Sequence, residues 1–266
     1  MFQNTKSFTI ALLLVFGLLA GACSKFQKLQ REGTIDEKYD AAMKFYEKDD
    51  FYRAGVLLEE LIPTLKGTER AERAQLTYAY CTYYQGDLML SAFYFKSFVE
   101  TFPRSEFAEE SAYMQALSLY QDSAPHNLDQ TSTYSAIETM QNFMMQYPES
   151  QYKDTCNVLA ESLRKKLERK AYENSKLYHK KEDYKAAIIA FDNFRKDYPE
   201  SQYNEEITYL KVETAYLLAK NSLVTKQKER YGQVVKFYQT FIDTYPKSKY
   251  VKQAEDMFVT ANKKIE

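Results

Sequence analysis

Proline recurs in this sequence in one fixed context, and that context constrains the fold more than any other feature. Four of the six prolines lie within the pattern aromatic-Pro-x-Ser-x-aromatic. The four copies span Phe102–Phe107, Tyr147–Tyr152, Tyr198–Tyr203 and Tyr245–Tyr250, and their prolines follow one another at intervals of 45, 51 and 47 residues. Punctuation of this kind at a nearly constant period indicates a chain built from stacked structural repeats.

The residues before each of these prolines carry a helical pattern. Side chains 12, 8, 5 and 1 residues before the proline share one face of an α-helix, because the offsets are four, three and four. The proline predicts the end of that helix, and the serine two residues later predicts a cap for the next one. The four sets are Ser91, Phe95, Phe98 and Phe102; Ala136, Met140, Phe143 and Tyr147; Ala187, Phe191, Phe194 and Tyr198; and Val234, Tyr238, Phe241 and Tyr245.

A first unit fits the same template without its proline. Ala54, Leu58, Leu61 and Leu65 take the four positions, and Lys66 stands where the proline would be. Terminal repeats are often atypical in this way.

Short turns and small residues complete each repeat. Tight turns are predicted at Asp49–Phe51, Gly86–Leu88 and Glu182–Tyr184. The helices before them carry small residues that allow close packing, namely Ala42, Ala79 and Ser175. This is the tetratricopeptide pattern without its Trp. We therefore predict an all-α fold, a tetratricopeptide-like superhelix of about five helix-turn-helix repeats and about ten helices. The small numbers of Gly and Pro, 7 and 6, agree with helices.

Two connections are longer than the template. One spans about Gln121 to Thr133, and the other spans about Asn221 to Tyr231. Extra residues between repeat helices usually form loops on one face, often a binding face. We therefore expect a long loop at each place.

The N-terminus has the pattern of an export signal. Lys6 precedes an apolar run from Phe8 to Leu19, and small residues precede Cys23. Residues 1–22 are therefore predicted to be a lipoprotein signal peptide, 23–34 a lipid-anchored tether, and 35–266 the repeat domain. Residues 19–23 resemble a bacterial lipobox, with its Leu four rather than three residues before the cysteine, so Cys23 is the expected lipid anchor. The alternative is an ordinary cleaved signal followed by a chance cysteine.

Several classes of function are excluded by what the sequence lacks. The 36 basic and 37 acidic residues are mixed along the chain, so no nucleic acid is expected as a partner. The only histidines, His126 and His179, share no metal-ligand spacing with other residues, and no phosphate loop or nucleophile motif is present. We therefore expect no catalytic residue, metal or cofactor. Cys81 and Cys156 are expected to be buried apolar residues.

One group of aromatic residues in the first two units lies outside the repeat faces. In tetratricopeptide repeats, the corresponding positions line the concave surface. A candidate peptide groove there would accept an extended or aromatic-ended peptide. The alternative is that these side chains pack between helices. The residues are Tyr39, Met43, Tyr46, Tyr80, Tyr83 and Tyr84.

The whole mature chain resembles the BamD family of lipoproteins of the bacterial outer-membrane β-barrel assembly machine. The most telling stretches are Ala112–Leu117, Leu128–Gln130 and Tyr147–Tyr152, in their order after the predicted anchor. The resemblance implies an outer-membrane lipoprotein facing the periplasm. The absence of acidic residues directly after Cys23 also favours that side of the membrane, since such a run marks surface export in relatives from the Bacteroidetes.

The resemblance also implies partners for each half of the repeat domain. N-terminal units, about 35–152, would receive unfolded β-barrel precursors through a C-terminal signal that ends in an aromatic residue. C-terminal units, about 153–266, would dock on the periplasmic domains of a BamA-like insertase. The alternative is another helical-repeat envelope lipoprotein, either a SusD-like glycan binder or a coordinator of peptidoglycan synthesis and division.

Overall fold

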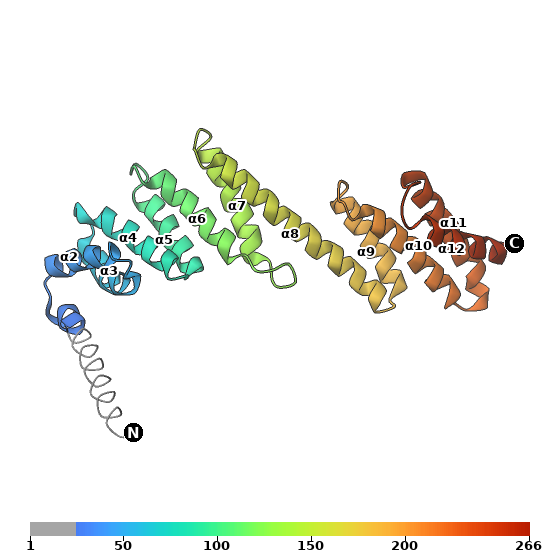
Figure 1. Cartoon of the computed structure of the whole chain (residues 1–266), viewed down its shortest axis with the longest axis horizontal. Helices are drawn as coiled ribbons and strands as arrows, with labels where there is room; N and C mark the ends of the chain where they lie inside the picture. Colours follow the sequence, from blue (N-terminus) through green and yellow to red (C-terminus); the bar gives the residue numbers. More distant parts are fainter. Residues whose placement is uncertain (1–24) are drawn as a thin grey trace, which may run out of the picture. The chain divides into compact units, whose positions relative to one another are not determined.

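The computed structural model describes residues 25–266, and all regular structure in that range is helical (Figure 1). The predicted all-α repeat fold is confirmed. The elements are α2 (Ile35–Tyr46), α3 (Phe51–Leu65), α4 (Arg70–Tyr84), α5 (Leu88–Thr101), α6 (Ala108–Asp122), α7 (Thr131–Gln146), α8 (Lys153–Lys180), α9 (Tyr184–Asp197), α10 (Asn204–Lys220), α11 (Val224–Thr244) and α12 (Val251–Ile265).

The helices belong to two compact units. The N-terminal unit contains the described residues up to Ala124 together with Gln130–Glu161, and the C-terminal unit contains Pro125–Asp129 and Ser162–Glu266. The division falls within α8, so the first part of this helix packs in one unit and the rest in the other.

Within each unit, successive helices run antiparallel through tight turns at the predicted positions. Each of these turns needs one residue with positive φ, and these are Asp49 at 58°, Gly86 at 84° and Glu182 at 61°. Asp50 accepts a hydrogen bond from the Arg53 amide at 3.2 Å and thereby caps α3. These turns let α4 pack on both α3 and α5, and the small residue Ala79 at that contact is fully buried.

The four-position faces form the core of each repeat, as predicted. Phe95 and Phe98 of α5 are fully buried in the N-terminal unit, and Phe191 and Phe194 of α9 are buried in the C-terminal unit. The aromatic residue directly before each proline of the motif is only partly buried. Tyr238 of α11 is also only partly buried, and its ring stacks on Phe258 of α12, with centroids 4.5 Å apart.

The serine of the repeated motif has a different role from the one predicted. It is not the N-cap of the following helix, which begins three residues later. Its hydroxyl accepts a hydrogen bond from the amide two residues on. In three of the four motifs it also donates to a glutamate on the helix that pairs with the one the motif ends, namely α4, α8 or α10. The donor–acceptor pairs are Ser105–Glu72, Ser201–Glu168 and Ser248–Glu205. The prediction of a simple cap was wrong because it considered only neighbours in sequence.

The last aromatic residue of the motif also contacts the preceding repeat. Tyr152 stacks on Tyr113, Tyr203 on Tyr172 and Tyr250 on Tyr209, with centroids 4.2, 4.0 and 4.4 Å apart and planes within 14°. In two of these pairs the stacked tyrosine lies four residues after the glutamate that accepts from the motif serine, so both contacts come from one face of the earlier helix. Serine and tyrosine together fix the register between consecutive repeats.

Replacing Tyr203 by Leu should loosen α10 from α8. The change keeps an apolar side chain but removes the stack on Tyr172, which is worth about 1 kcal/mol. Because stability in a repeat protein is a sum of local terms, native-state hydrogen exchange of α10 amides is the appropriate measurement. Tyr178→Leu, an exposed tyrosine of the same unit, is the control. Equal exchange in both variants would show that the stack contributes nothing.

One of the two predicted long loops is wrong. The structure places Asn221–Tyr231 almost entirely in helix, since α11 begins at Val224. The segment contains Lys, Gln, Glu and Arg, which are good helix formers, and no Gly or Pro. The other loop is confirmed at Ser123–Gln130, where the Lys170 ammonium donates to the carbonyl of Leu128 at 2.6 Å.

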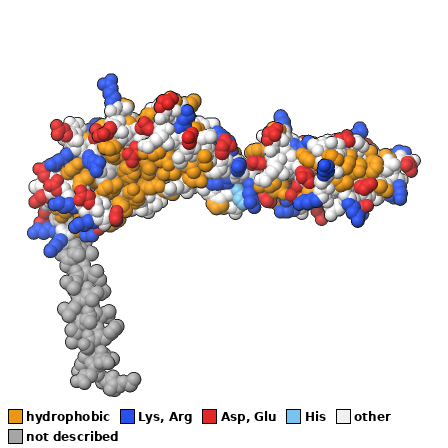
Figure 2. Space-filling model, turned by 45° about the horizontal axis from the view of Figure 1, so that its top comes forward, with side chains coloured by type: hydrophobic (Ala, Val, Ile, Leu, Met, Phe, Trp, Pro, Cys, Tyr) orange, Lys and Arg blue, Asp and Glu red, His pale blue; other side chains and the backbone are white. Residues whose placement is uncertain are grey.

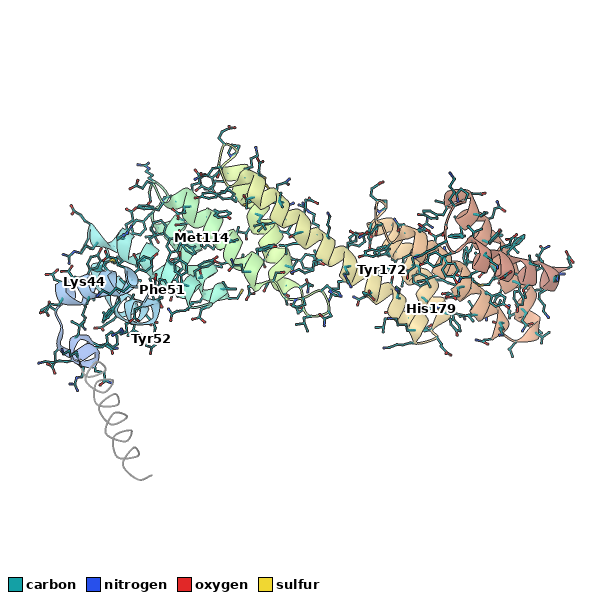
Figure 3. The ribbon with its side chains drawn as sticks, in the orientation of Figure 1. Lys44, Phe51, Tyr52, Met114, Tyr172 and His179 are labelled. Atoms are coloured by element: carbon teal, nitrogen blue, oxygen red, sulfur yellow. The ribbon has the colours of Figure 1, made fainter. Side chains whose placement is uncertain are left out.

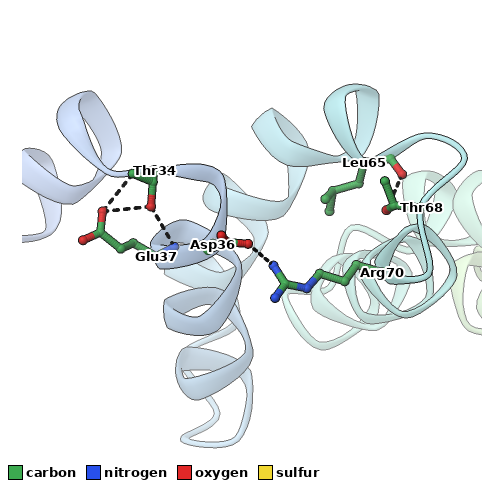
Figure 4. A network of polar contacts seen from close by, with 6 residues as sticks. All are labelled: Thr34, Asp36, Glu37, Leu65, Thr68 and Arg70. Atoms are coloured by element: carbon green, nitrogen blue, oxygen red, sulfur yellow. Dashed lines mark hydrogen bonds and ion pairs between the residues drawn. The ribbon is translucent and has the colours of Figure 1, made fainter.

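The chain before α2 is ordered from its first described residue. Residues 25–32, within the expected tether, are helical. Thr34 then caps α2 through a capping box with Glu37, and the Asp36 carboxylate pairs with Arg70 of α4 (Figure 4). The expected signal peptide and Cys23 lie outside the described residues. Within residues 25–266, no helix has the length and apolar character needed to cross a bilayer.

Candidate peptide-binding surface

Five aromatic rings from three consecutive helices form a continuous group in the N-terminal unit. We call Tyr46, Phe51, Tyr80, Tyr83 and Tyr84 the aromatic cluster. Tyr84, the last residue of α4, is its centre, with ring centroids 4.5 Å from Phe51, 5.5 Å from Tyr83 and 6.0 Å from Tyr80. Tyr46 adds an edge contact to Phe51 at 5.7 Å. The helical spacing of α4 and the tight turn before α3 bring these rings together.

Polar groups hold two of the rings in place. The Tyr80 hydroxyl donates to the Glu110 carboxylate of α6, and the Gln121 side-chain amide donates to the Tyr83 hydroxyl at 2.7 Å. Burial raises the pKa of Tyr46 to about 12, and burial together with Glu110 raises the pKa of Tyr80 further. These phenols therefore stay protonated, and the rings present an uncharged, amphipathic surface.

The structure brings together four of the six residues predicted for the groove. Tyr39 lies apart, with the Arg70 guanidinium 4.8 Å above its ring centroid. Met43 is packed against the core, and its sulfur lies 3.9 Å from the Thr77 hydroxyl. Phe51 belongs to the cluster, but the sequence pattern did not distinguish it from the neighbouring turn.

Exposure differs strongly within the cluster. Tyr84 is 53% exposed, whereas Tyr46, Phe51, Tyr80 and Tyr83 are partly buried. Phe51 and Tyr52 are the first two residues of α3, and both are labelled in Figure 3. Tyr52 is exposed. Most of these rings therefore pack between helices, as in the alternative interpretation, and Tyr84 is the most exposed ring of the cluster.

An apolar cavity of about 480 Å³ lies elsewhere in the same unit, and sequence reasoning missed it. It opens between α3 and α5 above α4. The corresponding hollow between α5 and α7 is lined mainly by polar side chains, including Gln115, Glu138 and Asn142. The one sequence signal for the apolar cavity is Pro63 inside α3. The lining residues are Ile62, Pro63, Lys66, Gly67, Ala71, Gln75, Tyr94, Ser97, Thr101 and Phe102.

Among the described residues, the one histidine on a helix and the two cysteines have structural surroundings. His179 of α8 lies 2.8 Å from the Thr214 hydroxyl and 3.4 Å from the Glu213 carboxylate. Cys81 and Cys156 are fully buried and unbonded, and burial raises the pKa of their thiols to about 12 and about 11. Such thiols are poor nucleophiles. Among residues 25–266, no three His, Cys, Asp or Glu side chains gather as metal ligands would.

Comparison with known protein families gives a match over both structural units of the chain. A family model described as an outer membrane lipoprotein, YfiO, matches residues 31–203 and 176–265. The chain belongs to the YfiO family of outer membrane lipoproteins. The matched segments cover both structural units, so the family assignment does not depend on the aromatic cluster alone.

Two curated relatives of this YfiO-family chain are both named outer membrane protein assembly factor BamD. The protein from Rickettsia prowazekii is 22% identical over 246 residues, which are 92% of this chain and 94% of the relative. The protein from Caulobacter vibrioides is 22% identical over 219 residues, which are 81% and 72% of the two chains. The resemblance to the BamD family found in the sequence is thus confirmed.

Proposed function

We propose that this protein is the BamD-type lipoprotein of a β-barrel assembly machine and helps to assemble and insert β-barrel proteins into the outer membrane. The observation that carries the proposal is the near full-length match to the Rickettsia prowazekii assembly factor, which includes both structural units. The protein acts as a scaffold and adaptor, without catalysing a reaction.

The proposal gives each part of the chain a role. Acyl chains on Cys23 hold the protein at the outer membrane, and the repeat domain faces the periplasm. The N-terminal unit receives unfolded barrel precursors. The C-terminal unit docks on the periplasmic domains of a BamA-like insertase.

The aromatic cluster suits the proposed contact with precursors. Its rings lie on two packed helix pairs, so a peptide would not have to order them when it binds. Uncharged tyrosines supply apolar contact area together with hydroxyl groups for hydrogen bonds to an extended backbone. These properties favour an aromatic-ended peptide as the ligand of Tyr84 and its neighbours.

Depletion of the protein in its own cells tests the function. We expect the amounts of folded outer-membrane barrel proteins to fall, as measured by heat-modifiable mobility on gels, while the tagged protein purified in mild detergent brings down a BamA-like insertase. A division defect with normal barrel levels, or binding of an oligosaccharide by calorimetry, would instead support one of the other envelope functions. Recovery of no insertase would contradict the docking role.

A further inference from the structure

The helix formed by residues 25–32 has two chemically different sides. Lys25, Lys28 and Arg31 follow one another at intervals of three, so they share one side of the helix, and all three are exposed. Phe26 and Leu29 occupy the other side and are partly buried against the core of the N-terminal unit. The helix therefore presents cations outward while its apolar side holds it to the fold.

Two contacts fix the orientation of this helix relative to α2. The Phe26 ring meets Phe45 edge to face, with centroids 5.7 Å apart and planes at 79°. The Gly33 amide donates to the Leu29 carbonyl at 2.8 Å, and a Cβ at position 33 would lie only 2.5 Å from that oxygen. Gly33 thus permits a close turn that a larger residue would open. The cations consequently keep a constant direction with respect to the N-terminal unit.

These cations have few partners among the described residues. The ammonium groups of Lys25 and Lys28 form no ion pair within residues 25–266, and Arg31 has only an exposed contact with Glu32 at 3.5 Å. The charges that follow on α2 are engaged differently, since Asp36 pairs with Arg70 and Lys38 with Glu60.

The charge balance leaves the helix basic. It carries three cations against one carboxylate. Glu32 and Glu37 border the same shallow hollow as Lys25 and Lys28. Figure 2 shows Lys and Arg side chains, in blue, around the place where the described chain begins.

The position of the helix in the chain indicates what the cations meet. Lys25 follows Cys23 by two positions, with only Ser24 between them, so the chain allows at most about 7 Å between their Cα atoms. We propose that Lys25, Lys28 and Arg31 form a docking surface for anionic phospholipid headgroups of the bilayer that holds the acyl chains of Cys23. This rests on the lipid anchor in the proposed function. The acyl anchor keeps this helix next to the lipid headgroups. Electrostatic attraction to anionic headgroups then orients the basic side of the helix toward the bilayer.

Vesicle binding without the acyl chains isolates this contribution. The probe is the mature chain carrying Cys23→Ser, mixed with vesicles of phosphatidylcholine alone or of phosphatidylcholine with phosphatidylglycerol, and assayed by co-sedimentation. We expect binding only to the anionic vesicles, weakening as salt is added. Each cation near such a surface contributes about a fivefold change in partitioning. The triple variant Lys25→Gln, Lys28→Gln and Arg31→Gln should therefore bind roughly 100-fold more weakly.

A matched control tests whether vesicle binding depends on these three cations or only on the net charge of the protein. Lys180, Lys181 and Lys185 are three exposed lysines of the C-terminal unit, and their triple replacement by Gln should leave vesicle binding unchanged. Inorganic phosphate should displace the protein no more than chloride at equal ionic strength, since a surface rather than a single phosphate is recognised. All six side chains are exposed and Gln is a good helix former, so both variants should melt like the parent.

The proposal would be overturned by equal binding to both kinds of vesicle, by an unchanged affinity in the first triple variant, or by an equal loss in the control. A stronger displacement by phosphate than by chloride would likewise contradict it. None of these measurements involves barrel assembly. Failure of the lipid contact is therefore distinguishable from failure of the proposed function, which the barrel levels of depleted cells report.

Discussion

Replacing Cys23 by Ser is expected to move the protein from the membrane fraction into the soluble periplasmic fraction. Stable anchoring requires more than one acyl chain, since a single chain binds a bilayer with an association constant of only about 10⁴ M⁻¹. A bacterial lipoprotein carries its acyl chains on the one residue that this change removes. Within residues 25–266 no helix could replace the anchor by crossing the bilayer.

Cell fractionation with labelled palmitate checks this prediction. The parent should carry label and sediment with membranes, while the Cys23→Ser chain should carry none. Cys81→Ala is the matched control, because Cys81 is fully buried in the repeat core and its thiol cannot be acylated there. A Cys23→Ser chain that still incorporates palmitate would show that another residue is the anchor. An unlabelled parent would favour the ordinary cleaved signal.

Tyr84→Ala is expected to weaken binding of an aromatic-ended barrel peptide by about 30-fold. An aromatic residue at the centre of a binding surface typically contributes about 2 kcal/mol, and 1.4 kcal/mol corresponds to a factor of ten in the dissociation constant. Tyr84 is the ring that contacts three neighbours and is also more than half exposed. Fluorescence anisotropy with a labelled peptide that ends in Phe measures the effect.

Tyr134→Ala provides the matched control for this experiment. Tyr134 is an exposed tyrosine on α7 of the same unit, away from the aromatic cluster, so its removal should leave peptide affinity unchanged. Ile62→Arg would place a charge in the apolar cavity between α3 and α5. If Tyr84→Ala binds normally and Ile62→Arg does not, the peptide occupies that cavity and the role proposed for the aromatic cluster is wrong.

The repeat fold was predictable because its signals are local. Phe95 and Phe98 lie on one helical face by spacing alone, and Pro103 ends their helix by excluding helical geometry before it. The turn at Gly86 follows from the freedom of glycine at positive φ. Each of these inferences involves residues within a few turns of one another, so no knowledge of the tertiary structure was needed.

The candidate site was only partly predictable because its contacts join separate helices. Tyr39 and Tyr84 both belong to the first two repeats, yet Tyr39 lies under Arg70 and Tyr84 stacks on Phe51. Spacing identifies the face of a helix on which a ring lies, but the neighbouring helix decides whether that ring is covered. The cavity beside Tyr94 was not predicted from the sequence for the same reason, since its walls come from three helices.

The sequence by itself determined the repeat register, the helical class and, through the position of Cys23, the expected attachment to a membrane. Only the tertiary structure decided what the repeated motif does. Its serine and its last aromatic residue contact a glutamate and a tyrosine some 30 to 45 residues earlier, as in Ser201–Glu168 and Tyr250–Tyr209. Periodicity specifies which residues recur in the sequence. The partner of each recurring ring belongs to another helix, so it is known only once the packing of the helices is known.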